Sequence, residues 1–351
     1  MNKKSTLRLI SAFAAGIFFV LILIFCVGMY VPLSLSRNSE NVRIEIPAGT
    51  STKNIASILK NNNLIRSQKL FYLAARFPLV VGRAQRYSLK SGVYNLNSGM
   101  KISEILSALE SGQQEYIKTV FPEGLTISKI AEILEEKGVC QKQDFILASR
   151  NYSLLKEYSI PSFSFEGFLF PDTYFFTPKM PAEDVIRMMA DNFFSKIQQI
   201  PEFAGKKTED FYQTLVLASV VEREYRVESE APLIASVFKN RIQQNIGLYS
   251  CATIEYIITE IQGRPHPDVI TYDDLKIDSP YNTYKWAGLP PGPISNPGLV
   301  ALKAAANPPK TDYYYFTLTD ESRGSHTFSK NFSSHTQAGI QFKTKKAASS
   351  R

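Results

Sequence analysis

The chain has 351 residues, enough for two or three compact modules, and is 44% apolar, 21% charged and 12% aromatic. This composition excludes a disordered or fibrous chain. The net charge of +8 suits anionic lipid headgroups or the acidic polymers of a cell envelope as well as nucleic acid. No RNP, zinc-finger or helix-turn-helix pattern accompanies the charge, so we expect no nucleic-acid partner.

The chain contains three cysteines, Cys26, Cys140 and Cys251, which are far apart and form no CxxC pair. This spacing argues against the common zinc and redox sites and against a disulfide framework. We expect free, buried thiols, with a single Cys140–Cys251 bridge as the alternative in an oxidising compartment. The three histidines also lack metal-ligand spacing, and we predict neither a metal nor another cofactor.

The N-terminal region predicts a membrane anchor. No charged residue occurs between Leu9 and Ser36, and an apolar run of about 20 residues crosses a hydrocarbon core. Basic residues in segment 1–8 favour a cytoplasmic N-terminus and an exported remainder. A cleaved signal peptide is the alternative, but the small-residue cleavage pattern is missing after residues 29–31. We therefore predict a transmembrane signal anchor at 9–35, which contacts lipid of the cytoplasmic membrane in a single pass.

Three segments of the exported part share a short strand, a turn and an amphipathic helix. They begin at IPAG (46–49), GVYNL (92–96) and FPEG (121–124). Small strand–helix modules of this kind resemble LysM-like units, which hold N-acetylated glycans. We therefore expect a LysM-like α/β module at 36–116 and a second small module at 117–160. A structural spacer without a ligand is the alternative for both.

The remaining part, residues 161–342, is predicted to form one α+β domain. Helical periodicity covers residues 182–197 and 211–225. A strand rich in Tyr and Phe is expected at residues 312–318. Residues 343–351 are predicted to be a solvated, frayed tail.

The strongest local signal for chemistry is LASVVEREY at 217–225. As a helix, this segment places Glu224 on a stripe with bulky apolar residues, and Glu222 about 200° around the helix axis. Glu224 then faces a cleft, where desolvation raises its pKa as a general acid working near neutral pH requires. From the helix alone, the alternative of two solvated charges near a helix end is favoured.

The chain as a whole resembles the MltG/YceG-like family of endolytic murein transglycosylases, from the N-terminal anchor almost to the C-terminus. The most specific segments, in order, are EGFLFPDTY (166–174), LASVVEREY (217–225), ASVFKNRI (235–242), YNTYKWAGLPPGPISNPG (281–298), ALKAAANP (301–308), YYYF (313–316) and SHTF (325–328). The catalytic glutamate of the family is the second acid of a V-E-x-E segment, which falls on Glu224.

The resemblance implies a lytic transglycosylase that cleaves MurNAc–GlcNAc bonds in nascent peptidoglycan strands, leaves 1,6-anhydro-MurNAc ends and limits strand length. It also implies peptidoglycan synthases as partners. Glu224 alone would serve as acid and then as base, whereas a hydrolase needs a second carboxylate at about 5–5.5 or 6.5–9.5 Å. The sequence leaves Asp172, Asp273 and Asp274 open for that second role, and the resemblance decides against it. A non-catalytic, glycan-binding envelope scaffold is the alternative function.

Six residues are candidates for substrate binding. Asn240 and Arg241 are expected on a second helix, where an amide could bind an acetamido group; helix packing or capping is the alternative for both. The others are expected in loops or strands: Tyr281, Asn282 and Tyr284, which precede the Pro-rich segment GLPPG and suit a rigid groove wall, and His326 in the SHTF segment.

The sequence departs from the family pattern at two places. Tyr225 stands where a small hydroxyl residue is usual, and Ser250-Cys251-Ala252 replaces a commoner Thr-Asp-Pro. The second change removes an acidic residue near the expected groove, which bears on how the substrate is positioned.

Overall fold

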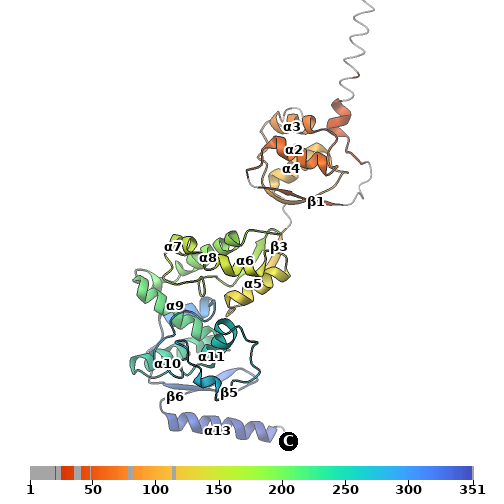
Figure 1. Ribbon diagram of the computed structural model, residues 1–351. Helices are drawn as coiled ribbons and strands as arrows, with labels where there is room; N and C mark the ends of the chain where they lie inside the picture. The colour runs from red at the N-terminus through yellow and green to blue at the C-terminus, as the bar shows by residue number, and fades with distance from the viewer. Residues whose placement is uncertain are drawn as a thin grey trace, which may run out of the picture. The chain divides into compact units, whose positions relative to one another are not determined.

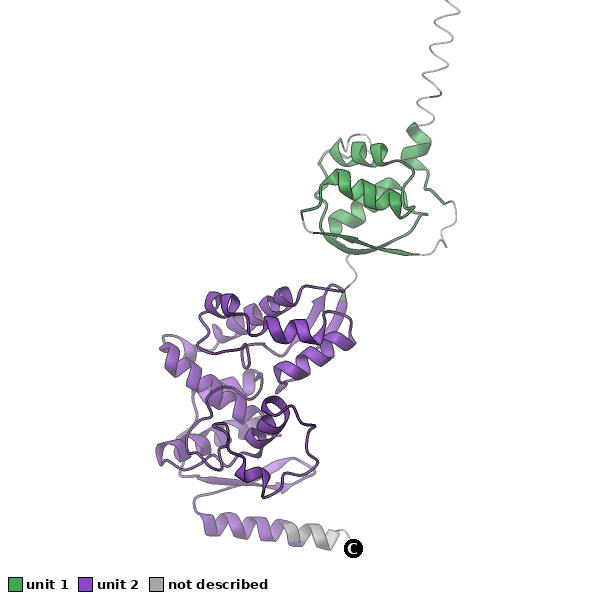
Figure 2. Cartoon of the chain, viewed as in Figure 1, with its two compact units in different colours: residues 1–116 green, residues 117–351 purple. Residues whose placement is uncertain are grey.

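The computed structural model describes residues 20, 25–34, 41–47, 49–77, 79, 83–112 and 116–349. The chain divides into two compact units, residues 1–116 and 117–351 (Figure 2). The predicted cytoplasmic segment 1–8 and most of the predicted anchor at 9–35 lie outside the described residues. Where positions are described, no helix has both the length and the apolar character needed to span a bilayer.

The first unit is a two-stranded antiparallel sheet packed against helices (Figure 1). Strand residues point alternately into the core and into solvent, so Ile44 and Ile46 are buried while Arg43 and Glu45 are exposed. The core is completed by the apolar faces of three helices. The elements are β1 (Val42–Ile46), α2 (Thr52–Asn61), α3 (Gln68–Arg76), β2 (Gly92–Leu96) and α4 (Ile102–Ser111).

The second unit is mixed α+β, as predicted, and begins with an antiparallel strand pair. β3 (Ile117–Val120) pairs with β4 (Thr173–Phe176), so residues 117–160 share one unit with the chain that follows. The predicted helix at 182–197 is confirmed as α8 (Ala182–Ile197). Three shorter helices separate these strands along the chain: α5 (Ile127–Glu136), α6 (Lys142–Ala148) and α7 (Tyr152–Glu157).

The C-terminal part of this unit contains the helices and the hairpin that surround the candidate site. α12 packs against α9 and α10, and α13 packs on the β5–β6 hairpin (Figure 1). The segment predicted as a frayed tail instead continues α13 through residue 349. The elements are α9 (Thr208–Glu222), α10 (Ala231–Gln243), α11 (Cys251–Tyr256), α12 (Leu299–Ala306), β5 (Tyr315–Asp320), β6 (Ser325–Ser329) and α13 (Phe332–Ser349).

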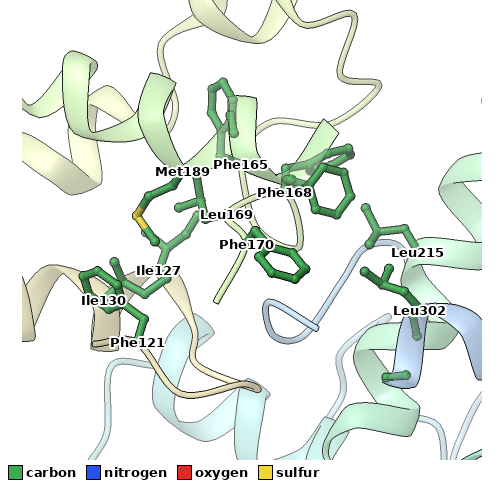
Figure 3. Packing of buried hydrophobic residues seen from close by; sticks show 14 of the residues in the cluster. Phe121, Ile127, Ile130, Phe165, Phe168, Leu169, Phe170, Met189, Leu215 and Leu302 are labelled. Atoms are coloured by element: carbon green, nitrogen blue, oxygen red, sulfur yellow. The ribbon is translucent and has the colours of Figure 1, made fainter. Parts of the chain in front are cut away.

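The core of the second unit is built around the EGFLFP segment, whose Phe and Leu side chains meet residues of several helices (Figure 3). Phe168 is 1% exposed and packs edge-on against Phe193, with 5.5 Å between the ring centroids. Gly167 has φ +88°, and a Cβ there would lie 2.7 Å from Pro293. Only glycine fits both the backbone conformation and the close approach of the Pro293 loop.

All three cysteines are free. The expectation of buried thiols is confirmed for Cys140 and is wrong for Cys26 and Cys251, which are exposed.

Candidate active site

The turn that follows α9 carries Glu224. α9 ends at Glu222, and the Glu224 amide donates to the carbonyl of Val221 at 3.0 Å in a tight turn. The helical stripe predicted for residues 217–225 is therefore wrong at its C-terminal end. The turn, rather than the helix face, directs Glu224 toward Ser250, whose hydroxyl donates to Glu224 Oε1.

Glu224 borders a cavity of about 710 Å³. Its walls come from α10, the 248–251 segment, the loop after residue 280, the β5–β6 hairpin and α13. The lining residues are Glu224, Phe238, Arg241, Leu248, Tyr249, Cys251, Tyr284, Tyr315, Phe316, Thr317, Leu318, His326, Phe332 and His335. A cavity of this size with convergent polar groups is typical of a small-molecule or substrate site.

Burial raises the pKa of Glu224 to about 7. The hydrogen bond from Ser250 opposes this shift because it stabilises the carboxylate, and the nearby charge of Glu255 adds to it. The positive charges of Arg223 and Arg241 also oppose it. The result is a carboxyl group that exchanges its proton near neutral pH, as a group acting as both acid and base requires.

Buried hydroxyl groups hold Ser250 in place. The Ser250 amide donates to Thr283 Oγ1 at 3.2 Å, and Thr253 Oγ1 donates to the Ser250 carbonyl at 2.8 Å. The two threonine hydroxyls are 2.9 Å apart, and both residues are buried. The sequence draws attention to residues 250–252 only because an acid is lost there. It gives no sign of the hydrogen bond from Ser250 to Glu224, which joins positions 26 residues apart.

Arg241, a predicted site residue, lies in the cavity wall and joins two segments. Its Nε donates to the carbonyl of Tyr314 and its Nη1 to the carbonyl of Leu248, each at 2.6 Å. The guanidinium carbon lies 5.2 Å from the ring centroid of Tyr315 and 5.6 Å from that of Tyr249. Arg241 is 6% exposed and lines the same cavity as Glu224, so it supplies a fixed positive charge there.

Tyrosine rings form one wall of the cavity. Predicted Tyr284 lies there, with its ring centroid 5.5 Å from that of Tyr249 and its hydroxyl 3.1 Å from Cys251 Sγ. Tyr249 has φ +52°, a costly conformation for a bulky residue. Such strain is typical of functional sites. The sequence contains no signal that would have selected Tyr249.

The other predicted residues divide between the cavity and its supports. His326 lines the cavity, with its Nδ1 2.7 Å from Glu230 Oε2. Asn240 Nδ2 donates to the carbonyls of Thr311 and Tyr313, both at 2.9 Å.

Asn282 Nδ2 donates to the carbonyls of Leu275 and Ile277, and Tyr281 packs 5.2 Å from Tyr256. The lining of the cavity therefore does not include Asn240, Asn282 or Tyr281; Asn240 and Asn282 hold backbone that leads to it.

No second acid faces Glu224 among the described residues that line the cavity, and the nearby Glu255 lies outside this lining and pairs with Arg223 at 2.8 Å. Asp172 binds Asn192, Asp273 pairs with Lys276, and Asp274 accepts from Thr271. Glu222 points elsewhere, since its Oε2 accepts from the amide of Gly298 at 2.9 Å. Within the described part of the chain, no group of three or more His, Cys, Asp or Glu is placed to hold a metal ion.

A single carboxylic acid of near-neutral pKa, set beside a fixed arginine in a tyrosine-walled cavity of an α+β unit, defines a candidate acid–base enzyme that works through one carboxyl group. The sequence model of the YceG-like family matches residues 44–340, and the chain belongs to this family.

Relatives of the chain are named endolytic murein transglycosylases. It is 33% identical to that of Bacillus subtilis over 317 residues, which cover 86% of this chain and 84% of the relative. Identity to the Streptococcus pneumoniae serotype 2 protein is 29% over 336 residues, covering 86% of this chain and 59% of the relative. The crystal structure of a YceG-like protein from Listeria monocytogenes superposes with a TM-score of 0.56 at 31% identity, covering 86% of this chain and 99% of that one.

Proposed function

We propose that this chain is an endolytic peptidoglycan lytic transglycosylase in which Glu224 is the catalytic acid and base. The observation that carries the proposal is Glu224, a half-buried residue at a cavity of about 710 Å³, whose carboxyl group has its pKa raised by burial to about 7. Relatives that share about a third of its residues over most of the chain bear the name of this activity.

The chemistry needs one carboxyl group. Protonated Glu224 donates its proton to the oxygen of the MurNAc–GlcNAc bond as the bond from that oxygen to the muramic anomeric carbon breaks. The muramic 6-hydroxyl then attacks the same carbon, and the Glu224 carboxylate takes up the hydroxyl proton. The products are a 1,6-anhydro-MurNAc end and a free GlcNAc 4-hydroxyl, with no water consumed. Ser250 already donates to Oε1, so Oε2 is the oxygen free to carry the proton.

The test is digestion of purified sacculi, with products resolved by mass spectrometry. We expect anhydro-muropeptides from the unaltered protein and at least an about 100-fold loss in Glu224→Gln, because an amide cannot transfer the proton. Glu222→Gln is the matched control: it alters the neighbouring acid outside the cavity and should keep most of the activity.

Equal release by the Glu224→Gln variant would contradict the assignment. Products heavier by one water would instead indicate hydrolysis, and strand binding without any product would favour the glycan-binding scaffold.

The proposal extends to the rest of the chain. The uncharged run at 9–35 preceded by basic residues supports a single-pass anchor in the cytoplasmic membrane, with the enzyme on the extracytoplasmic side. The strand–helix build of residues 42–111 supports a LysM-like role in holding glycan. Action on nascent strands makes peptidoglycan synthases the expected partners.

A further inference from the structure

A second hollow lies on the same loop as Tyr284. Its volume is about 410 Å³, and it is lined by Asp278, Ser279, Pro280 and Trp286. Trp286 is the one tryptophan of the chain and is 54% exposed. Aromatic side chains of this size bury about 150–250 Å² when they pack fully. The half-exposed ring therefore retains apolar surface that a ligand could cover.

The backbone that carries Trp286 is held rigidly. Asn282 is fully buried, and its carbonyl accepts from the amides of Lys285 at 3.1 Å and Trp286 at 3.0 Å. Its side-chain oxygen accepts from the Tyr284 amide at 2.9 Å. One buried residue thus fixes both the cavity tyrosine and the exposed tryptophan, so little ordering is needed when a ligand binds.

The groups around Trp286 suit a sugar. A flat, polarisable ring can cover the apolar face of a pyranose, while charged groups at its edge bind hydroxyl and acetamido groups. Asp278, with an 83% exposed side chain, and Lys285, with a 35% exposed one, supply an acceptor and a donor. They are joined by a hydrogen bond of 2.7 Å, and Lys285 Nζ lies 5.7 Å from the Trp286 ring centroid.

The hollow and the cavity of the candidate active site are lined by neighbouring residues of one loop. A single residue separates Tyr284, in the wall of the cavity, from Trp286, so their Cα atoms are at most about 7 Å apart. We infer that Trp286 forms a second glycan-binding subsite, which holds sugar units of the same peptidoglycan strand beyond those at Glu224. This rests on the proposed function and makes the enzyme favour long strands over short ones.

Because the chain has a single tryptophan, its intrinsic fluorescence reports on this subsite directly. We would titrate Glu224→Gln, which leaves strands intact, with peptide-free glycan strands prepared from sacculi and with a tetrasaccharide of the same repeat. The expected result is a saturable change in Trp286 emission with strands and none with the tetrasaccharide, which is too short to reach beyond the units held at Glu224. Emission unchanged while co-sedimentation shows the strands to be bound would overturn the inference.

A kinetic comparison tests the same point in the active enzyme. For Trp286→Ala we expect an about fivefold higher KM on long strands with kcat retained, because one stacking contact is lost. The KM on the tetrasaccharide should be unchanged. Tyr272→Ala is the matched control, because Tyr272 is an 86% exposed aromatic residue of the same unit that lines neither hollow. Equal KM values for the two variants on long strands would also refute the subsite.

The two proposals fail separately. Cleavage of strands with no response at Trp286 removes the subsite and leaves the enzyme, whereas a Trp286 response without anhydro products removes the proposed activity and leaves a glycan-binding site.

Discussion

Ser250 connects the proposed catalytic acid to the fold. Its hydroxyl donates to Glu224, and its backbone is fixed by Thr253 and Thr283. A hydrogen bond to the charged form of a carboxyl lowers its pKa, so Ser250 limits how far burial raises the pKa of Glu224. The contact also fixes the orientation of the carboxyl group. Both effects can be measured.

Replacing Ser250 with Ala should raise the pKa of Glu224, so that the acid stays protonated to higher pH. We expect the alkaline limb of the kcat/KM profile, near pH 7 in the unaltered enzyme, to move to higher pH. We also expect kcat at the optimum to fall on the order of tenfold, because the carboxyl loses its fixed orientation. Ser250→Thr keeps the hydroxyl and should restore both. A lower kcat with an unmoved alkaline limb would leave Ser250 a structural role only.

Glu224 is predicted from the family resemblance of its V-E-x-E segment and not from the geometry of the helix. Residues 215–221 are all buried, so no polar face marks where α9 ends, and helical periodicity alone predicts a helix that continues past Glu222. The contact with Ser250 depends on tertiary packing that no local pattern carries. The predicted amides, Asn240 and Asn282, bind backbone carbonyls instead, since buried loops also need side-chain donors.

At the scale of elements, the loop around Glu166 joins α5 to the Asn296 segment. Glu166 is 5% exposed, and its oxygens accept from the amide of Ile127, at the start of α5, and from Asn296 Nδ2. Burial raises the pKa of Glu166 to about 8. The neutral form is therefore the one that the fold accommodates near pH 7.

This arrangement predicts a pH dependence of stability. The folded pKa of Glu166 is raised, so the folded state binds the proton more tightly than the unfolded state. Its contribution is complete below pH 4.5 and is lost as the pH rises through 8. Glu166→Gln is neutral at every pH and of similar size, so the fall in melting temperature of the second unit between pH 5 and 8 should be smaller. Calorimetry across that range would refute this if both proteins lost stability equally.

Elements with a clear apolar stripe were predicted best. α8 has one buried face and one exposed face, and both of its ends match the prediction. α13 lacks a comparable stripe, and its packing on the β5–β6 hairpin shows only in the fold. Local periodicity therefore predicted amphipathic helices and missed the helix that tertiary contacts support.

At the scale of the whole molecule, the two units have separate hydrophobic cores. The residues that line the candidate active site all belong to the second unit. We therefore expect residues 117–351 to fold alone and to keep the kcat of the full chain on soluble strands within about twofold, since distant, independent parts contribute additively. Circular dichroism and the muropeptide assay check this. A folded fragment without activity would show that the first unit takes part in catalysis.

The occupied oxygen of Glu224 has a stereochemical consequence. Because Ser250 binds Oε1, one oxygen must reach both the departing bridge atom and the incoming hydroxymethyl oxygen, and it can do so only if both lie on one face of the ring. In a β-linked D-pyranose they share that face; in an α-linked one they lie on opposite faces. Anomeric selectivity would then follow from the use of one carboxyl group as both acid and base, without any group that recognises the linkage itself.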